Sequence, residues 1–131
     1  MTDISSLYIY IGIGLAGAFG AVLRHGVDRF LHYAIPTSFP AGIMLVNLSG
    51  SLFIGFLTGW MITGVVDGSV FLVLSVGFAG SYTTFSGWMV QTVELMENGL
   101  WKSAVWNLLL HVIPGWVLTL GGLFLGMHGW Q

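Results

Sequence analysis

The sequence predicts an all-α membrane protein with four spanning helices, and three observations support this. Hydrophobic side chains make up 56% of the 131 residues and charged ones 6%, with a mean hydropathy of +0.91. Four apolar runs approach the roughly 20 residues that a helix needs to cross roughly 30 Å of hydrocarbon. Short polar stretches separate the runs. Because lipid offers backbone groups no partner, the runs should be helices, and residues 1–131 should form one transmembrane unit.

The first apolar run covers about residues 7–23. It contains GIGLAG at 12–17, which matches the GxGxxG fingerprint of dinucleotide-binding proteins, but the run has neither the preceding strand nor the later acidic residue of that motif. Gly12, Ala16 and Gly20 are spaced by four. Small residues at this spacing let helix backbones approach closely in lipid. We therefore interpret the run as a helix with a packing face.

The second apolar run covers about residues 42–65 and follows the polar stretch RHGVDRFLHYAIPTSFP at 24–40, which we interpret as a connection. Ser51, Gly55 and Gly59 again repeat at a spacing of four and predict a second packing face. Asn47 stands near the start of the run, in LVNLSGS. A polar side chain within a span is costly, so it either bonds a neighbouring helix or belongs to a functional site.

The third apolar run covers about residues 70–90, after a VDGS turn, and contains GSYTTFSG at 80–87. Glycine costs about 1 kcal/mol inside a helix, and hydroxyl side chains compete for backbone hydrogen bonds. We therefore expect this helix to break in mid-membrane. Non-helical backbone at that depth is tolerated where protein buries it or water reaches it, and transporters hold ions at such breaks. The freed carbonyls suit a hard cation, whereas the hydroxyls suit an anion.

The fourth apolar run covers about residues 104–127, after ELMENG at 94–99. Asn107 and His111 share one face of this helix, four residues apart. Each is either a functional polar group or a hydrogen-bonded group in a helix interface. The clustering of polar side chains in three of the four runs favours a functional site.

Charge placement bears on orientation. With four spans, both termini and the second-to-third connection share a side that carries no Lys or Arg, while Arg24, Arg29 and Lys102 lie at the other side. The positive-inside rule puts those three in the cytoplasm, but so few charges give a shallow bias, and the chain could insert both ways. Four close-packed helices leave no room for a solvated path. Transport would therefore require a dimer.

Three motifs, in order, resemble those of the Fluc/CrcB fluoride channels: GLAGAFGAVLRH at 14–25, LVNLSGSLFIG at 45–55 and GFAGSYTTFSGW at 77–88. The resemblance covers nearly the whole chain. It implies a passive, selective fluoride channel that relieves fluoride toxicity in the cell (inner) membrane. It also implies an antiparallel, dual-topology homodimer with two pores. A structural Na⁺ at the dimer centre would be held by the backbone carbonyls of Gly80 and Thr83 from both subunits.

The chemistry of such a pore can be argued from the residues. Fluoride is small and strongly hydrated, so a dry passage must replace its water with donors that do not trap it. The amide of Asn47 and the hydroxyls of Thr84 and Ser86 are neutral donors. Phe85 matches the first of two family phenylalanines whose weakly positive ring edges face the anion. Arg24, at the end of the first run, either attracts anions at the vestibule or anchors the helix by snorkelling.

The chain departs from the family where TTFSTF typically stands, since it reads TTFSGW at 83–88. Trp88 replaces the second phenylalanine and adds an N–H donor, and Gly87 would give its bulk room. Gln91 stands where the family usually has a glutamate. Asn107 and His111 match positions where the family often places pore-lining tyrosine and serine. Either can donate, and a protonated His111 would attract anions.

The same residues bear on three other classes of protein: a multidrug exporter, a structural membrane protein and an enzyme. A small multidrug exporter also pairs four-span subunits in dual topology, but it relies on a carboxylate in the first span, and residues 7–23 contain none. A purely structural membrane protein would not need clustered donors at a helix break. The spans contain no nucleophile with a base, no metal-ligand cluster and no paired carboxylates, so we do not expect an enzyme.

Overall fold

The computed structural model describes residues 4–35 and 37–129, and over these residues all regular structure is helical. The long helices are α1 (Ile4–Ala34), α2 (Ala41–Ile62) and α6 (Trp101–His128). The third span is made of α3 (Gly68–Leu72), the π-helix η1 (Val73–Ala79), α4 (Gly80–Tyr82) and α5 (Phe85–Glu97). Four segments are long and apolar enough to cross a membrane. The prediction of an all-α chain with four such segments is confirmed.

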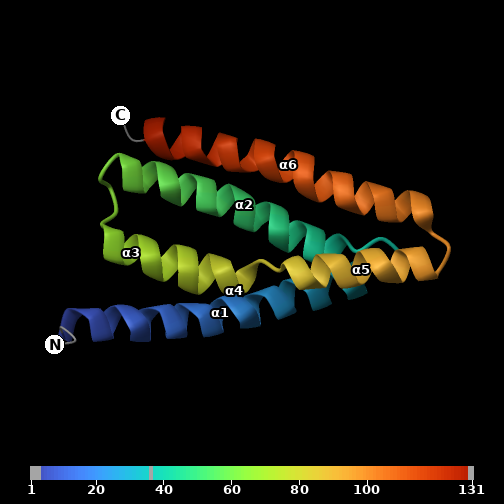
Figure 1. The fold of residues 1–131 in the computed structure, drawn as a ribbon, viewed down its shortest axis with the longest axis horizontal. Coiled ribbons are helices and arrows are strands. Elements are labelled where there is room, and N and C mark those ends of the chain that lie inside the picture. Colours follow the sequence, from blue (N-terminus) through green and yellow to red (C-terminus); the bar gives the residue numbers. More distant parts are fainter. Residues whose placement is uncertain (1–3, 36, 130–131) are drawn as a thin grey trace.

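The four segments run alternately in opposite directions along one axis. Figure 1 shows both chain ends at the same end of the molecule, together with the connection between α2 and α3. The connection from α1 to α2 and the one from α5 to α6 lie at the opposite end. The basic residues Arg29 and Lys102 therefore share that end, as the sequence predicts.

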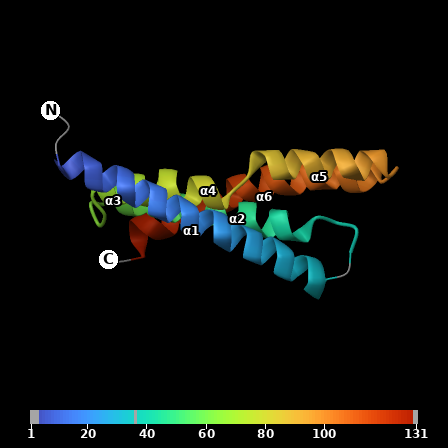
Figure 2. The same ribbon diagram turned by 90° about the horizontal axis from the view of Figure 1, so that it is seen from below.

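The first helix is longer than its apolar run. Residues 24–34 belong to α1, so their interpretation as a connection is wrong, and the chain between α1 and α2 is confined to residues 35–40. The polar side chains of this stretch do not end the helix. It ends shortly before the first proline in the sequence, Pro36, because proline drives the residue before it away from the α conformation. Figure 2 shows the second half of α1 diverging from α5.

Glycines bring α2 and α6 into direct backbone contact. A Cβ built on Gly55 would overlap Thr119, and one built on Gly122 or Gly126 would overlap the backbone of α2 at Leu52 or Phe56. With no hydrophobic effect between helices in lipid, such close packing is what holds them together. The predicted packing face at Gly55 is confirmed, and it lies against α6.

The glycine face of α1 packs against the third span. A Cβ on Gly20 would lie 2.5 Å from the carbonyl oxygen of Phe78, and one on Gly12 would lie 3.0 Å from the side chain of Val73. Ala16, between them, faces Gly77. The predicted packing face of the first helix is confirmed, and it fixes α1 against the π-helix.

Two residues between α4 and α5 are not helical. Thr83 has φ −77° and ψ 161°, and Thr84 has φ −151° and ψ 121°, so both are extended. The seven residues before α4 form a π-helix, a rare element that often accompanies functional sites. This extended pair brings the backbone of the third span next to α2, where Asn47 lies.

Candidate functional site

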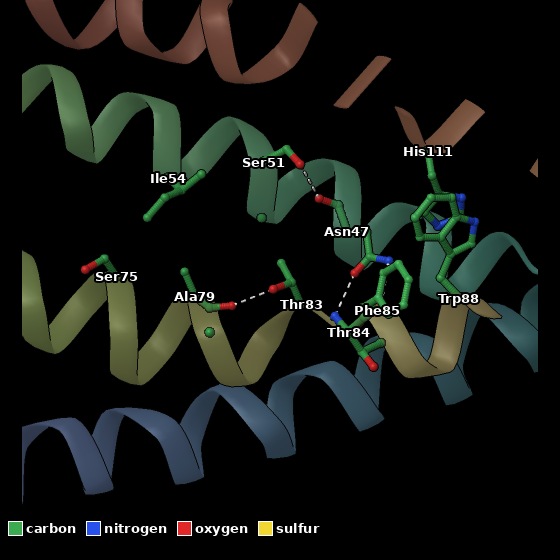
Figure 3. Close-up of a pocket in the computed structure, with 12 residues that line it drawn as sticks. Asn47, Ser51, Ile54, Ser75, Ala79, Thr83, Thr84, Phe85, Trp88 and His111 are labelled. Carbon is green, nitrogen blue, oxygen red and sulfur yellow. Dashed lines mark hydrogen bonds between the residues drawn. The ribbon is translucent and has the colours of Figure 1, made fainter. Parts of the chain in front are cut away.

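A cavity of about 410 Å³ lies beside the extended pair, between the third span and α2, and reaches α6 (Figure 3). Seven of the ten residues that we expected at the site line it: Asn47, Gly80, Thr83, Thr84, Phe85, Trp88 and His111. Its lining contains no Asp, Glu, Lys or Arg. The lining therefore includes polar side chains but no fixed charge, apart from any proton that His111 takes up.

The side chain of Asn47 clamps the backbone of Thr84. Its Oδ1 accepts the Thr84 N–H at 2.8 Å, and its Nδ2 donates to the Thr84 carbonyl at 3.0 Å. Both backbone groups would lack partners in an extended segment at membrane depth, where an unsatisfied group costs several kcal/mol. One N–H of the amide is used in this clamp, so the second is left for another acceptor.

Thr84 also caps α5. Its Oγ1 accepts the N–H of Gly87 at 3.0 Å and lies 3.2 Å from the Oγ of Ser86. One hydroxyl proton suffices for the bond between Thr84 and Ser86, so the pair retains a second proton that it can donate elsewhere. Ser86 is exposed and does not line the cavity.

Gly87 leaves space for the capping residue. A Cβ on Gly87 would lie 2.9 Å from Cγ2 of Thr84 and 3.5 Å from the side chain of Ile43. The missing side chain therefore makes room for Thr84. That Gly87 also gives Trp88 room stays a prediction.

Phe85 reaches out from the first turn of α5 and is 71% exposed. Its ring meets that of Trp88 edge to face, with centroids 5.6 Å apart and planes at 88° (Figure 3). Such a pair presents ring hydrogens, which carry a partial positive charge. Both rings line the cavity.

Trp88 is held by α6. Its Nε1–H donates to the backbone carbonyl of Asn107 at 3.2 Å, and its ring stacks on that of His111 with centroids 4.8 Å apart and planes at 18°. The indole N–H is thus already used and is not a free donor in the cavity. The sequence identified this donor but could not show where it goes.

Asn107 lies behind the cavity wall. It is fully buried, and its Nδ2 donates to Oγ1 of Thr92 on α5 at 2.9 Å. Thr92 in turn donates to the backbone carbonyl of Trp88 at 2.8 Å. Asn107 does not line the cavity, so it connects α5 and α6 instead of presenting its amide there.

His111 lines the cavity with an almost completely buried ring. Its Nδ1 lies 2.8 Å from the carbonyl oxygen of Asn107. Its Nε2 is buried and has no hydrogen-bond partner among the described residues. Asn107 Oδ1 and Gln91 Oε1 share that condition.

Arg24 lies within α1 and not at the end of the helix. Its Nη1 donates to the backbone carbonyl of Thr83 at 3.2 Å, across a separation of 59 residues. The side chain is half-buried and does not line the cavity. The guanidinium therefore stands beside the extended pair, a contact that no pattern in the sequence indicated.

The carbonyls of Gly80 and Thr83 were expected to hold a cation. In a regular helix the N–H of Thr84 would bond the Gly80 carbonyl, but here it donates to Asn47, so that carbonyl is released from its helical partner. The Thr83 carbonyl accepts from Arg24 and keeps a second lone pair. Carbonyl oxygens are the ligands that hard cations prefer. The residues fit such an ion, although the Arg24 charge opposes it and two carbonyls do not complete a coordination shell.

The cavity also contains two serines that the motifs did not single out. Ser51 donates to the carbonyl of Asn47 at 2.9 Å, and Ser75 donates to that of Phe71 at 2.6 Å. Both protons are used within their own helices, so these hydroxyls offer oxygen lone pairs to the cavity. The spacing of Ser51, four residues after Asn47, was the available signal.

Comparison with known proteins gives a consistent match. The family model described as CrcB-like protein, Camphor Resistance (CrcB), matches residues 11–123. A Symbiobacterium thermophilum protein named fluoride-specific ion channel FluC 2 is 38% identical over 105 residues, 79% of this chain and 85% of that protein. A Mycobacterium tuberculosis protein of the same name is 38% identical over 114 residues, 87% of each chain. The fluoride-specific ion channel FluC of a Sulfurovum species is 36% identical over 118 residues, 90% of this chain and 93% of its own.

Proposed function

This chain belongs to the CrcB family, and on that basis we propose that it is a fluoride-selective ion channel that lets F⁻ leave the cell passively and so relieves fluoride toxicity. The family is one of channels and not of enzymes. The observation that carries the proposal within this chain is the cavity beside Thr83 and Thr84, whose lining combines neutral polar groups and aromatic rings and contains no Asp, Glu, Lys or Arg.

A neutral cavity suits conduction of a small anion, because the anion must enter the passage without binding tightly. A fixed positive charge in a dry passage would hold fluoride tightly, whereas neutral donors replace its hydration with weaker contacts. The available donors are the second N–H of the Asn47 amide and the spare hydroxyl proton of Thr84 and Ser86. The exposed ring of Phe85 adds C–H groups next to them.

We assign the second aromatic station of the pathway to Trp88, with His111 behind it on α6. Asn107 completes this part of the pathway through its carbonyl, which accepts the indole N–H. Arg24 supplies a positive charge beside Thr83 that would raise the local anion concentration without lining the cavity.

We further propose that the third helix is broken within the membrane at Thr83 and Thr84. Their extended backbone supports this, and so does their position near the middle of the apolar segment Gly68–Glu97. A break at that depth needs protein to satisfy its backbone, and the Asn47 clamp does so from α2.

An antiparallel homodimer would complete the site. Gly80 and Phe85 line the cavity yet are exposed in the single chain, so lipid would face polar backbone there unless a second copy covered it. The low count of three Lys and Arg residues supports insertion in both orientations into the cell (inner) membrane. A second copy would also contribute its own Gly80 and Thr83 carbonyls. Together the four carbonyls would hold a structural Na⁺, which would tie the two breaks to each other.

The direct test is fluoride efflux from liposomes that contain the purified protein, followed with a fluoride electrode. Loaded with potassium fluoride and opened to potassium by an ionophore, the vesicles should release fluoride rapidly. Vesicles loaded with potassium chloride should release no chloride above the rate of protein-free vesicles. Equal rates for both anions, or no fluoride release, would contradict the proposal.

A further inference from the structure

Trp88 is fixed on three sides by contacts that no single motif predicts. Its N–H is bound to the carbonyl of Asn107, one face of its ring is covered by His111, and its other neighbour is the ring of Phe85. Figure 3 shows the rings of Trp88 and His111 overlapping at one end of the cavity. An aromatic ring held in this way cannot turn without losing several contacts.

We propose that His111 is a positioning residue: its imidazole fixes the Trp88 ring as a rigid wall of the fluoride passage and does not itself bind the ion. The inference rests on the proposed function and deepens it. It names His111 as the residue that holds Trp88 in place and thereby sets the width of the passage there. The sequence suggested that His111 donates a hydrogen bond to the anion. The proposal gives it a different role.

The hydrogen-bond pattern of the imidazole supports this role. The partner of Nδ1 is a backbone carbonyl, which can only accept, so Nδ1 carries a proton. In the neutral ring Nε2 then holds a lone pair, which repels an anion. Nε2 is moreover buried, with no partner among the described residues. The neutral ring thus has no free proton to offer fluoride. One face of the ring stacks on Trp88 instead.

The carbonyl of Asn107 is the common anchor of this arrangement. It accepts from both Trp88 Nε1 and His111 Nδ1, so the two rings are bound to one point on α6. The Asn107 amide reaches Thr92, which bonds back to the carbonyl of Trp88. These hydrogen bonds hold α5 and α6 together on either side of the indole. Because the ring lines the cavity, its orientation decides how large an anion can pass.

A matched pair of substitutions separates stacking from hydrogen bonding. His111→Phe keeps a ring that can stack on Trp88 but loses the Nδ1 proton, whereas His111→Ala loses both. Phe at this position should leave fluoride efflux within about twofold of the unsubstituted protein. Ala should lower it about fivefold, the factor that corresponds to one typical aromatic pair, and should allow a measurable chloride leak.

The chain provides its own control. His128 repeats the same local geometry near the end of α6, since its ring stacks on Phe124 at 4.5 Å and its Nδ1 lies 3.0 Å from the carbonyl of Phe124. That pair lines neither the main cavity nor the neighbouring hollow at Trp116. His128→Ala should therefore change neither fluoride efflux nor the fluoride-to-chloride ratio.

A spectroscopic measurement covers the case in which His111→Ala disturbs the fold. In a protein whose tryptophans other than Trp88 are replaced by Phe, quenching of fluorescence by acrylamide reports how accessible this one ring is. Quenching should rise in His111→Ala and stay unchanged in His111→Phe.

Three results would overturn the inference. One is equal damage from His111→Phe and His111→Ala, which would assign the role to the hydrogen bond. Another is a step in fluoride efflux between about pH 5.5 and 7.5 that His111→Phe abolishes, which would make the proton on His111 the active feature. The third is unchanged quenching in His111→Ala. Rapid fluoride efflux by the unsubstituted protein in the same series would leave the channel function itself intact.

Discussion

The side chain of Asn47 bonds both backbone polar groups of Thr84, the N–H at 2.8 Å and the carbonyl at 3.0 Å. The two residues are 37 positions apart, so α2 supplies to the third span the partners that a helix would otherwise supply to itself. This makes Asn47 a structural element of the site as well as a donor within it.

Asn47→Asp should abolish fluoride efflux and destabilise the protein. The substitution replaces the Nδ2 donor with an oxygen, so the Thr84 carbonyl loses its partner and faces a negative charge. Leaving one buried carbonyl unsatisfied costs about 1–3 kcal/mol of unfolding free energy, and the added charge costs more. Efflux from liposomes and thermal unfolding in detergent measure the two effects.

Asn98→Asp is the matched control for this substitution. Asn98 also donates its Nδ2 to a backbone carbonyl, that of Glu94 at 2.8 Å, but it is exposed at the end of α5. Its replacement should leave efflux and melting temperature nearly unchanged. Normal efflux by Asn47→Asp would remove Asn47 from the pathway.

Phe85→Ile should abolish fluoride efflux without lowering the melting temperature. The ring is 71% exposed in the single chain, so its loss removes little packing within the fold. What it removes is the aromatic edge at the cavity, which isoleucine cannot replace. The comparison is with Phe30→Ile on α1, a ring that is 69% exposed but far in the chain from the site. Efflux that is reduced equally in both variants would contradict a special role for Phe85.

Thr84→Val should shorten or loosen the start of α5, because it removes the Oγ1 that accepts the N–H of Gly87. Loss of such a cap costs about 1 kcal/mol, and Thr84→Ser, which retains the hydroxyl, should cost much less. The same change also removes the spare donor shared with Ser86. We therefore expect lower efflux from the Val variant and near-normal efflux from the Ser variant. Equal activity of the two would show that the hydroxyl is dispensable.

Gly122→Ala should lower the melting temperature markedly, whereas Gly121→Ala should not. A Cβ at Gly122 would overlap the backbone of Leu52 on α2, but one at Gly121 would meet nothing within 4 Å. Alanine is a better helix former than glycine by about 1 kcal/mol, so the melting temperature of the Gly121 variant should even rise slightly. Unfolding in detergent, monitored by circular dichroism, compares these neighbours directly. A similar melting temperature for both would contradict the close packing of α2 on α6.

Some features of the site could be expected from the sequence and others could not. Asn47, Thr84, Phe85 and Trp88 were identified because uncharged polar and aromatic groups in an apolar run are costly and therefore informative. Their partners were not identified, because hydrogen bonds such as that from Asn47 to Thr84 join residues 37 positions apart. Gly87 shows the same limit. Its contact with the side chain of Thr84 depends on the cap at the start of α5, which its residue type does not indicate.

The sequence by itself determined that this protein is helical and lies in a membrane, because composition and the length of apolar runs decide which solvent a chain can enter and which backbone structure that solvent permits. It also determined the glycine faces, since small residues at a spacing of four necessarily share a side of a helix. The tertiary structure alone decided which donors remain free: Trp88 gives its proton to Asn107, and Asn47 gives one to Thr84. The physical reason is that a donor's availability depends on the acceptors that other helices bring within about 3 Å of it, and residue type carries no information about those neighbours.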